Sequence, residues 1–171
     1  MKATLNEKEA ELYRDIYEAT TKTINRFGST PPMAFITVGN NCQLPGSPKP
    51  GSIVGVELEI PENGKDAVAA FLKHFCKKAD AQCALLVLES WMSCPTPEQA
   101  AEYKRTGEFP RPSQDPNRKE IVMFSLQRKG QAFCGFVPIQ RTSLGIASIP
   151  EVAPELDFDN SEGRFSGLLD D

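Results

Sequence analysis

The stretch that most constrains the fold is Cys83-Ala-Leu-Leu-Val-Leu-Glu89, in which six consecutive residues are apolar and the seventh is a carboxylate. Side chains of a strand alternate between two faces, so an unbroken apolar run predicts a central strand that is covered on both sides. A chain of 171 residues, 40% of them hydrophobic, can bury enough surface for one core without disulfides or a structural metal. We therefore expect a single domain around this strand.

Three segments have the pattern of helices. Asn6–Glu9 has the form of a capping box, and Tyr13–Phe27 carries apolar residues at helical spacing before a glycine. Asn63 is expected to cap a second helix. The apolar stripe of that helix consists of Val68, Phe71, Leu72, Phe75, Cys76 and Ala79. A capping box also opens the segment 96–105, which predicts a short third helix.

Alternating apolar residues predict further strands at 33–38, 53–60, 121–127 and 132–139. The strand at 53–60, the second helix and the strand at 83–89 are expected to form a right-handed β-α-β crossover with a parallel pair. Lys129-Gly130 predicts a turn that joins the last two strands. The predicted fold class is α+β, with a mixed sheet of about five strands, the β-α-β crossover, a C-terminal antiparallel hairpin and a long N-terminal helix.

Residues 151–171 form an acidic C-terminal extension to a domain of residues 1–150. The extension holds seven acidic residues and one base, for a local charge of −6, so the first 150 residues carry +2 of the net −4. Its large apolar residues are Leu156, Phe158, Phe165, Leu168 and Leu169. A fully solvated tail has little use for such side chains. We therefore expect an ordered contact element that packs on its own domain or docks on a partner or a second copy.

Five cysteines without a C-x-x-C pair, and a single histidine, argue against a zinc site. The chain has no apolar leader and no run of about 18 apolar residues, which predicts a reduced, cytoplasmic protein that is not embedded in a membrane. Cys76, Cys83 and Cys134 fall in helix and strand patterns and are expected to be shielded, whereas Cys42 lies in a loop and is expected to react first.

The candidate site lies where the apolar strand ends. Glu89 and Trp91 point the same way on a strand, and Arg118 and Glu120 open a later strand. If these two strands pair antiparallel, all four residues converge at one edge of the sheet, where α/β proteins often bind ligands. One interpretation is a structural ion pair, in which Glu89 and Arg118 support the long crossover under a packed Trp91. The same four residues are the candidate binding residues.

The alternative interpretation is a metal site. Glu89, Asp115 and Glu120 would then hold a divalent cation such as Mg²⁺ or Mn²⁺, or act as general acid and base. The familiar nucleotide-binding, hydrolase and zincin motifs are absent from the sequence. The leading interpretation therefore assigns no catalytic residue and no cofactor.

The elements Glu89-Ser-Trp-Met92 and Pro112-Ser-Gln-Asp-Pro-Asn-Arg118-Lys-Glu120 resemble a group of uncharacterised bacterial and phage-type proteins with an E-x-W-M and a P-S-x-x-P-x-R-x-E pattern. The resemblance covers roughly a third of the chain and implies no activity. We expect a non-enzymatic binding or assembly protein, phage-related or regulatory, that self-associates or binds a protein partner. The alternative is a small metal-assisted hydrolase or nuclease, and a third option is an acidic inhibitor that acts through the extension.

Nucleic acid is a weaker expectation as a partner. The segment 104–119 is locally basic through Lys104, Arg105, Arg111, Arg118 and Lys119. The net charge of −4 and the pI of about 5.2 exclude the broad basic surface that most non-specific nucleic-acid binding requires.

Overall fold

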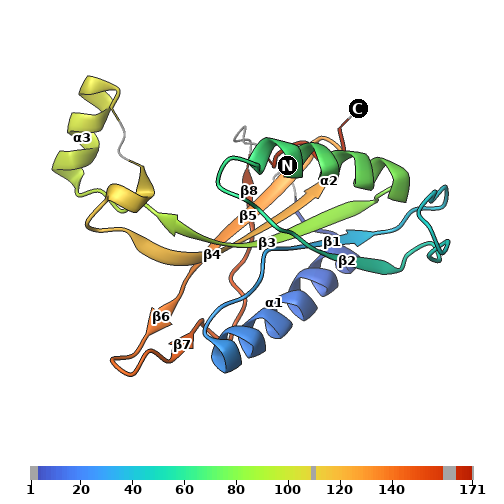
Figure 1. Cartoon of the computed structure of the whole chain (residues 1–171), viewed down its shortest axis with the longest axis horizontal. Helices are drawn as coiled ribbons and strands as arrows, with labels where there is room; N and C mark the ends of the chain where they lie inside the picture. Colours follow the sequence, from blue (N-terminus) through green and yellow to red (C-terminus); the bar gives the residue numbers. More distant parts are fainter. Residues whose placement is uncertain (1–3, 109–110, 160–164, 171) are drawn as a thin grey trace.

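The computed structural model describes residues 4–108, 111–159 and 165–170. Helices α1 (Glu7–Phe27), α2 (Lys65–Ala79) and α3 (Pro97–Thr106) and the 3₁₀ turn η1 (Pro112–Gln114) accompany a sheet (Figure 1). The strands are β1 (Met33–Thr37), β2 (Ile53–Glu57), β3 (Cys83–Met92), β4 (Lys119–Arg128), β5 (Gln131–Pro138), β6 (Gln140–Arg141), β7 (Ala147–Ser148) and β8 (Asp157–Asp159). Six of them form one sheet in the order β2-β1-β3-β4-β5-β8, and β6 pairs with β7. The α+β fold class is confirmed.

Helix α1 begins and ends where the sequence predicts. The Asn6 side chain accepts a hydrogen bond from the backbone N–H of Glu9, and the Glu9 carboxylate accepts one from the backbone N–H of Asn6, at 3.0 and 2.8 Å. Gly28, with φ of 81°, ends the helix in the left-handed conformation. Tyr13 and Tyr17 are buried against the sheet and contact the ring of Phe124 on β4, so α1 is fixed to one face of the sheet.

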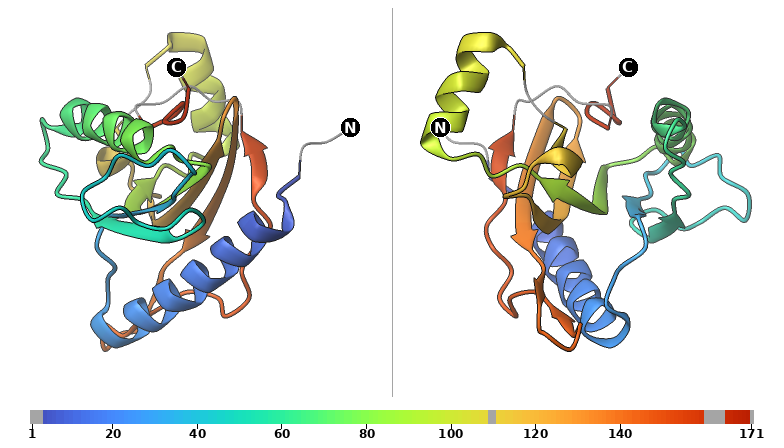
Figure 2. Two further views of the ribbon diagram at one scale, coloured as in Figure 1. Left: turned by 90° about the vertical axis from the view of Figure 1, so that its right-hand side faces the viewer. Right: turned by 60° about the vertical axis from the view of Figure 1, so that its left-hand side comes forward.

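Strand β3 lies inside the sheet and is covered on both faces, as its apolar run predicts. Leu85 and Val87 belong to the core under α1, and Ala84, Leu86 and Leu88 belong to a second core under α2. Figure 2 shows α1 and α2 on opposite sides of the sheet. The domain therefore has two apolar layers that share one central strand.

Two expectations about this region are wrong. All strand pairings among the described residues are antiparallel, because β1 lies between β2 and β3 and pairs with both. Strands β2 and β3 do run the same way with α2 between them in sequence, so the β-α-β connection forms, but without a parallel pair or a mixed sheet. The N-cap of α2 is Gly64, not Asn63, because the Gly64 N–H closes a turn on the Pro61 carbonyl at 2.9 Å.

The described parts of the C-terminal extension are ordered on their own domain. Strand β8 pairs with β5 at the edge of the sheet. Leu168 is 2% exposed and lies in the core under α2, where Phe165 and Leu169 pack beside it. The buried Gln127 side chain holds this segment, since it donates to the Phe165 carbonyl and accepts from the Leu168 N–H. Residues 160–164 lie outside the described residues.

Strands β3 and β4 extend beyond β1, with β5 beside β4 as far as Ile121, and carry α3 at their far end (Figure 1). We call residues 89–120 the arm, of which 109 and 110 lie outside the described residues. The capping box of α3 forms as predicted, between Thr96 and Gln99. None of the described residues of α3 is buried. Among the described residues, no helix is both long enough and apolar enough to cross a membrane.

Candidate interaction site

The four residues of the leading interpretation share the sheet face that α1 covers further along. Strands β3 and β4 pair antiparallel, with Trp91 directly opposite Glu120 and Glu89 opposite Val122. Glu89 and Trp91 are two positions apart on β3 and Glu120 lies opposite Trp91, so alternation places these three on one face. Arg118 precedes β4 and joins them through its contact with the Trp91 ring. The predicted convergence is therefore present in the strand register.

Arg141 on β6 also belongs to this site, although no pattern in the sequence predicts it. Its guanidinium donates two hydrogen bonds to the Glu120 carboxylate, at 2.7 and 2.6 Å. These hydrogen bonds lower the pKa of Glu120 and raise that of Arg141. A two-residue strand has no detectable pattern in the sequence, so only the path of the chain after β5 reveals this residue.

Glu89 has a different partner from the one expected. Its carboxylate accepts a hydrogen bond from the backbone N–H of Thr30 at 2.6 Å, which ties β3 to the linker between α1 and β1. Burial raises the pKa of Glu89, and the nearby charge of Glu120 adds to this effect, whereas Arg141 opposes it. The expected salt bridge to Arg118 is not among the contacts of Glu89 in the described part of the chain.

Arg118 lies over Trp91 instead. The centre of its guanidinium is 4.7 Å from the centroid of the Trp91 ring, within the range of a cation–π contact. The ring is 45% exposed. A large aromatic side chain that is held by a cation and still faces solvent is typical of a contact surface.

Asp115 has a structural role at the base of the arm. Its side chain is 2% exposed and accepts hydrogen bonds from the backbone N–H groups of Asn117 and Cys94, at 2.8 and 3.0 Å. The first of these contributes most to lowering the pKa of Asp115. The carboxylate thus closes the loop that returns from α3 to β4.

The three carboxylates of the alternative interpretation do not form one cluster: Glu89 and Glu120 lie near each other beside Arg141, whereas Asp115 faces backbone amides. Within residues 4–108, 111–159 and 165–170, no group of three or more His, Cys, Asp or Glu side chains is placed to hold a metal ion. Asp115 faces backbone amides, Glu120 faces Arg141, and Glu89 faces Thr30. The geometry therefore gives these three groups three separate tasks.

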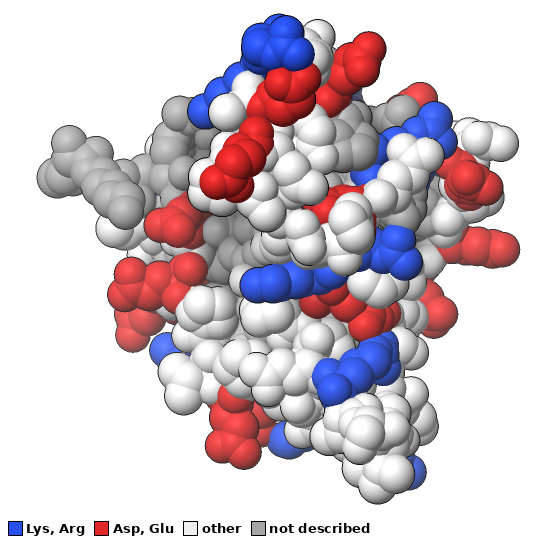
Figure 3. Space-filling model, turned by 90° about the vertical axis from the view of Figure 1, so that its left-hand side faces the viewer, with Lys and Arg blue, Asp and Glu red and all other residues white. Residues whose placement is uncertain are grey.

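The surface of the arm has mixed charge. Arg105 on α3 pairs with Glu102 at 2.5 Å, and Arg118 lies over Trp91. Figure 3 shows that acidic and basic side chains are interspersed on this side of the molecule. Such a surface lacks the continuous positive area that a nucleic-acid backbone would need.

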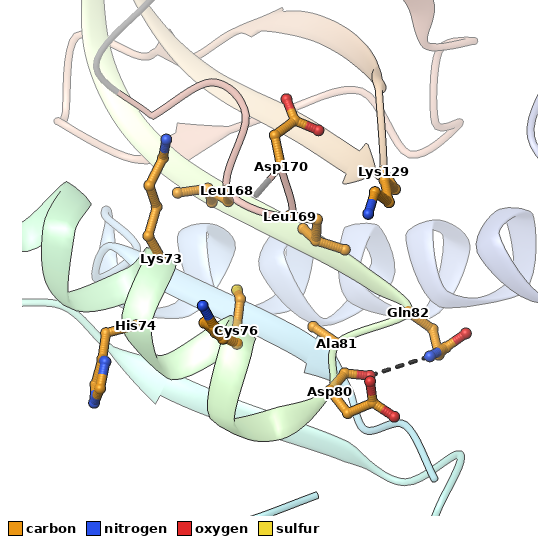
Figure 4. A pocket seen from close by; sticks show the side chains of 11 residues that line it. Lys73, His74, Cys76, Asp80, Ala81, Gln82, Lys129, Leu168, Leu169 and Asp170 are labelled. Atoms are coloured by element: carbon orange, nitrogen blue, oxygen red, sulfur yellow. Dashed lines mark hydrogen bonds between the residues drawn. The ribbon is translucent and has the colours of Figure 1, made fainter. Parts of the chain in front are cut away.

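A separate cleft of about 550 Å³ lies between α2, the β4–β5 turn and the C-terminal segment. Its lining includes Lys73, Lys77 and Lys129 together with Asp80 and Asp170. Figure 4 shows Leu168 and Leu169 facing α2 across this cleft. Here too the charges are mixed.

The cysteines follow the expected order of burial in part. Cys76 and Cys83 are buried, and burial raises the pKa of both thiols, to about 11 for Cys76. Cys42 is half-buried in its loop, and Cys134 is also half-buried rather than shielded. Within the described residues, the outer side of β5 pairs with the short β8, so Cys134 lies near the edge of the sheet.

Comparisons with known proteins give no relative for this arrangement: no family model, no curated protein and no solved structure matches the chain. The resemblance to phage-type proteins stays a prediction.

Proposed function

We propose that this protein is a non-enzymatic binding or assembly protein that contacts another protein through the arm. The observation that carries the proposal is Trp91, 45% exposed and covered by the guanidinium of Arg118 at 4.7 Å. Trp and Arg are the residue types most enriched at the energetic centres of protein interfaces. Arg also tolerates partial desolvation better than Lys.

The shape of the arm supports a contact role. Helix α3 has ten residues, which is too short to be stable as an isolated helix in water. None of its described residues is buried, so packing on the body of the domain does not account for it. A capped helix at the tip of two extended strands instead provides a defined surface for another molecule.

The chemistry of the site favours binding over hydrolysis. A hydrolytic site needs a carboxylate that is available to water, substrate or metal. The Glu120 carboxylate is engaged by two nitrogens of Arg141, the Asp115 carboxylate by two backbone amides and the Glu89 carboxylate by the Thr30 N–H. The same groups hold the arm in one conformation, which reduces the entropic cost of binding.

Site-specific photo-crosslinking of the full chain inside cells tests the proposal. One crosslinker replaces Ala101 on α3, and the control replaces Lys22 on α1; both are exposed helix positions. We expect a discrete adduct at position 101 that is absent at position 22. The adduct should disappear in the Trp91→Ala, Arg118→Ala double variant. The same adducts at both positions, or an adduct at 101 that survives the double variant, would overturn the proposal.

A further inference from the structure

The end of β3 has a free edge. Strand β1 pairs with β3 from Cys83 to Val87, whereas β4 pairs with it as far as Met92. Among the described residues, residues 88–92 therefore pair with a strand on one side only, and Figure 1 shows β3 running past the start of β1. The linker before β1 contacts this part of β3 through the Thr30 N–H, which donates to the side chain of Glu89 and leaves the Glu89 backbone unpaired. The pairing stops where Pro31 would lie opposite Glu89, because a proline has no N–H to donate.

The register identifies which backbone groups face this edge. The Val38 N–H donates to the Ser52 carbonyl on the β2 side. Backbone groups of successive residues point to opposite neighbouring strands, so those of the odd-numbered residues of β1 point to β3. Their partners Leu85 and Val87 face β1 in return. By alternation, the N–H and C=O groups of Glu89 and Trp91 point to the open edge. The β1 pairing ends at Val87, and no turn, loop or cap hydrogen bond among the described residues engages those four groups.

We infer that this edge pairs with the same edge of a second copy of the chain, antiparallel and centred on Ser90. The inference rests on the proposed function and names its partner. In this register Glu89 of one copy lies opposite Trp91 of the other. Each of these pairs exchanges two N–H···O=C hydrogen bonds, so all four free groups of each chain are satisfied. The contact is isologous and closes after two copies.

The side chains in this register complement one another. On the α1 face, the Glu89 carboxylate of one copy meets Trp91 of the other, which carries the Arg118 guanidinium over its ring. The acid and the cation that the sequence suggested as partners thus come together between chains. On the opposite face Leu88 meets Met92, an apolar pair. No pair of like charges lies directly opposite across the axis.

Sedimentation and light scattering across micromolar to millimolar concentrations test the pairing. The full chain is expected to be a dimer that dissociates on dilution. Ser90→Lys places two like charges opposite each other at the axis and should weaken the dimer at least tenfold. Glu57→Lys, on the free edge of β2, is the matched control and should leave the dimer unchanged. A native chain that is monomeric throughout, or a dimer that survives Ser90→Lys, would overturn the inference.

A disulfide tests the register directly. The two Ser90 residues form a non-hydrogen-bonded pair, in which Cβ atoms come close enough for a disulfide. Ser90→Cys, in a background where Cys42, Cys94 and Cys134 are serine, should give a covalent dimer on mild oxidation. Glu57→Cys in that background should remain largely monomeric on a non-reducing gel. Equal crosslinking of the two variants contradicts the register.

A charge exchange tests the contact between Glu89 and Arg118. Glu89→Lys and Arg118→Glu should each weaken self-association, and their equimolar mixture should restore it as a heterodimer, because both contacts then pair opposite charges. Failure of the mixture to restore the dimer counts against the contact. If the native chain is monomeric while position 101 still gives an adduct with a different protein, this inference fails and the proposed function stands.

Discussion

The docking of the C-terminal segment can be tested by removing one side chain. Leu168 is 2% exposed and lies in the core under α2. Truncation of a buried leucine to alanine costs about 2–5 kcal/mol, because the transfer free energy is lost and a cavity remains. The segment lies at the end of the chain and can partly collapse, so we expect about 3 kcal/mol for Leu168→Ala.

Chemical and thermal unfolding measure this loss. With a urea m-value of about 2 kcal/mol/M, a loss of about 3 kcal/mol moves the midpoint down by about 1.5 M. The melting temperature of a domain of this size should fall by roughly 6–12 °C. The control is Leu144→Ala, because Leu144 is 86% exposed and its loss should change stability by less than about 0.5 kcal/mol. Equal effects of the two variants would refute the docked position of Leu168.

Three further outcomes follow from the site and the thiols. Arg141→Ala should destabilise the fold by at most about 1 kcal/mol at neutral pH. The loss should vanish in acid, because the contact with Arg141 that lowers the pKa of Glu120 stabilises the fold only while Glu120 is ionised. For Glu89→Gln, urea unfolding should show the opposite dependence on pH. Because the pKa of Glu89 is raised, ionising this side chain destabilises the native chain, so the variant should become more stable relative to the native chain as pH rises from acid to neutral. Native alkylation followed by mass spectrometry should modify Cys42 well before Cys76, whose pKa of about 11 leaves little thiolate at neutral pH.

Local patterns in the sequence were sufficient to predict most of the elements. Both capping boxes, the buried run of β3 and the Lys129-Gly130 turn are determined by neighbouring residues, and so the sequence predicts them well. The position of β1 between β2 and β3 depends on which strand pairs with which across many residues. No short sequence pattern indicates which strands pair, so the prediction of a parallel pair was wrong.

For the candidate site, the position of the residues could be predicted from the sequence, but their side-chain partners could not. The antiparallel order of β3 and β4 predicted that Glu89, Trp91, Arg118 and Glu120 converge at one edge of the sheet. The register brings Trp91 opposite Glu120, and Arg118 lies over Trp91. The partners within that face were not predictable, because β6 brings Arg141 to Glu120 and the linker before β1 brings Thr30 to Glu89. Side-chain pairing depends on distances of a few ångströms, which alternation alone does not fix.

At Glu89, strand β3 passes from the buried core to the proposed contact surface. Up to Leu88, β3 is covered by α1 or α2 and is 9% exposed or less at every position, so it has to be apolar. Beyond that point β1 no longer pairs with it, and the strand carries a carboxylate and an exposed ring. Substitutions before this boundary, such as Leu86→Ala, should act on stability by about 2–5 kcal/mol. Substitutions after it, such as Trp91→Ala, should act on binding while the unfolding midpoint changes little, and a variant at Trp91 that unfolds the domain would show that the arm belongs to the core.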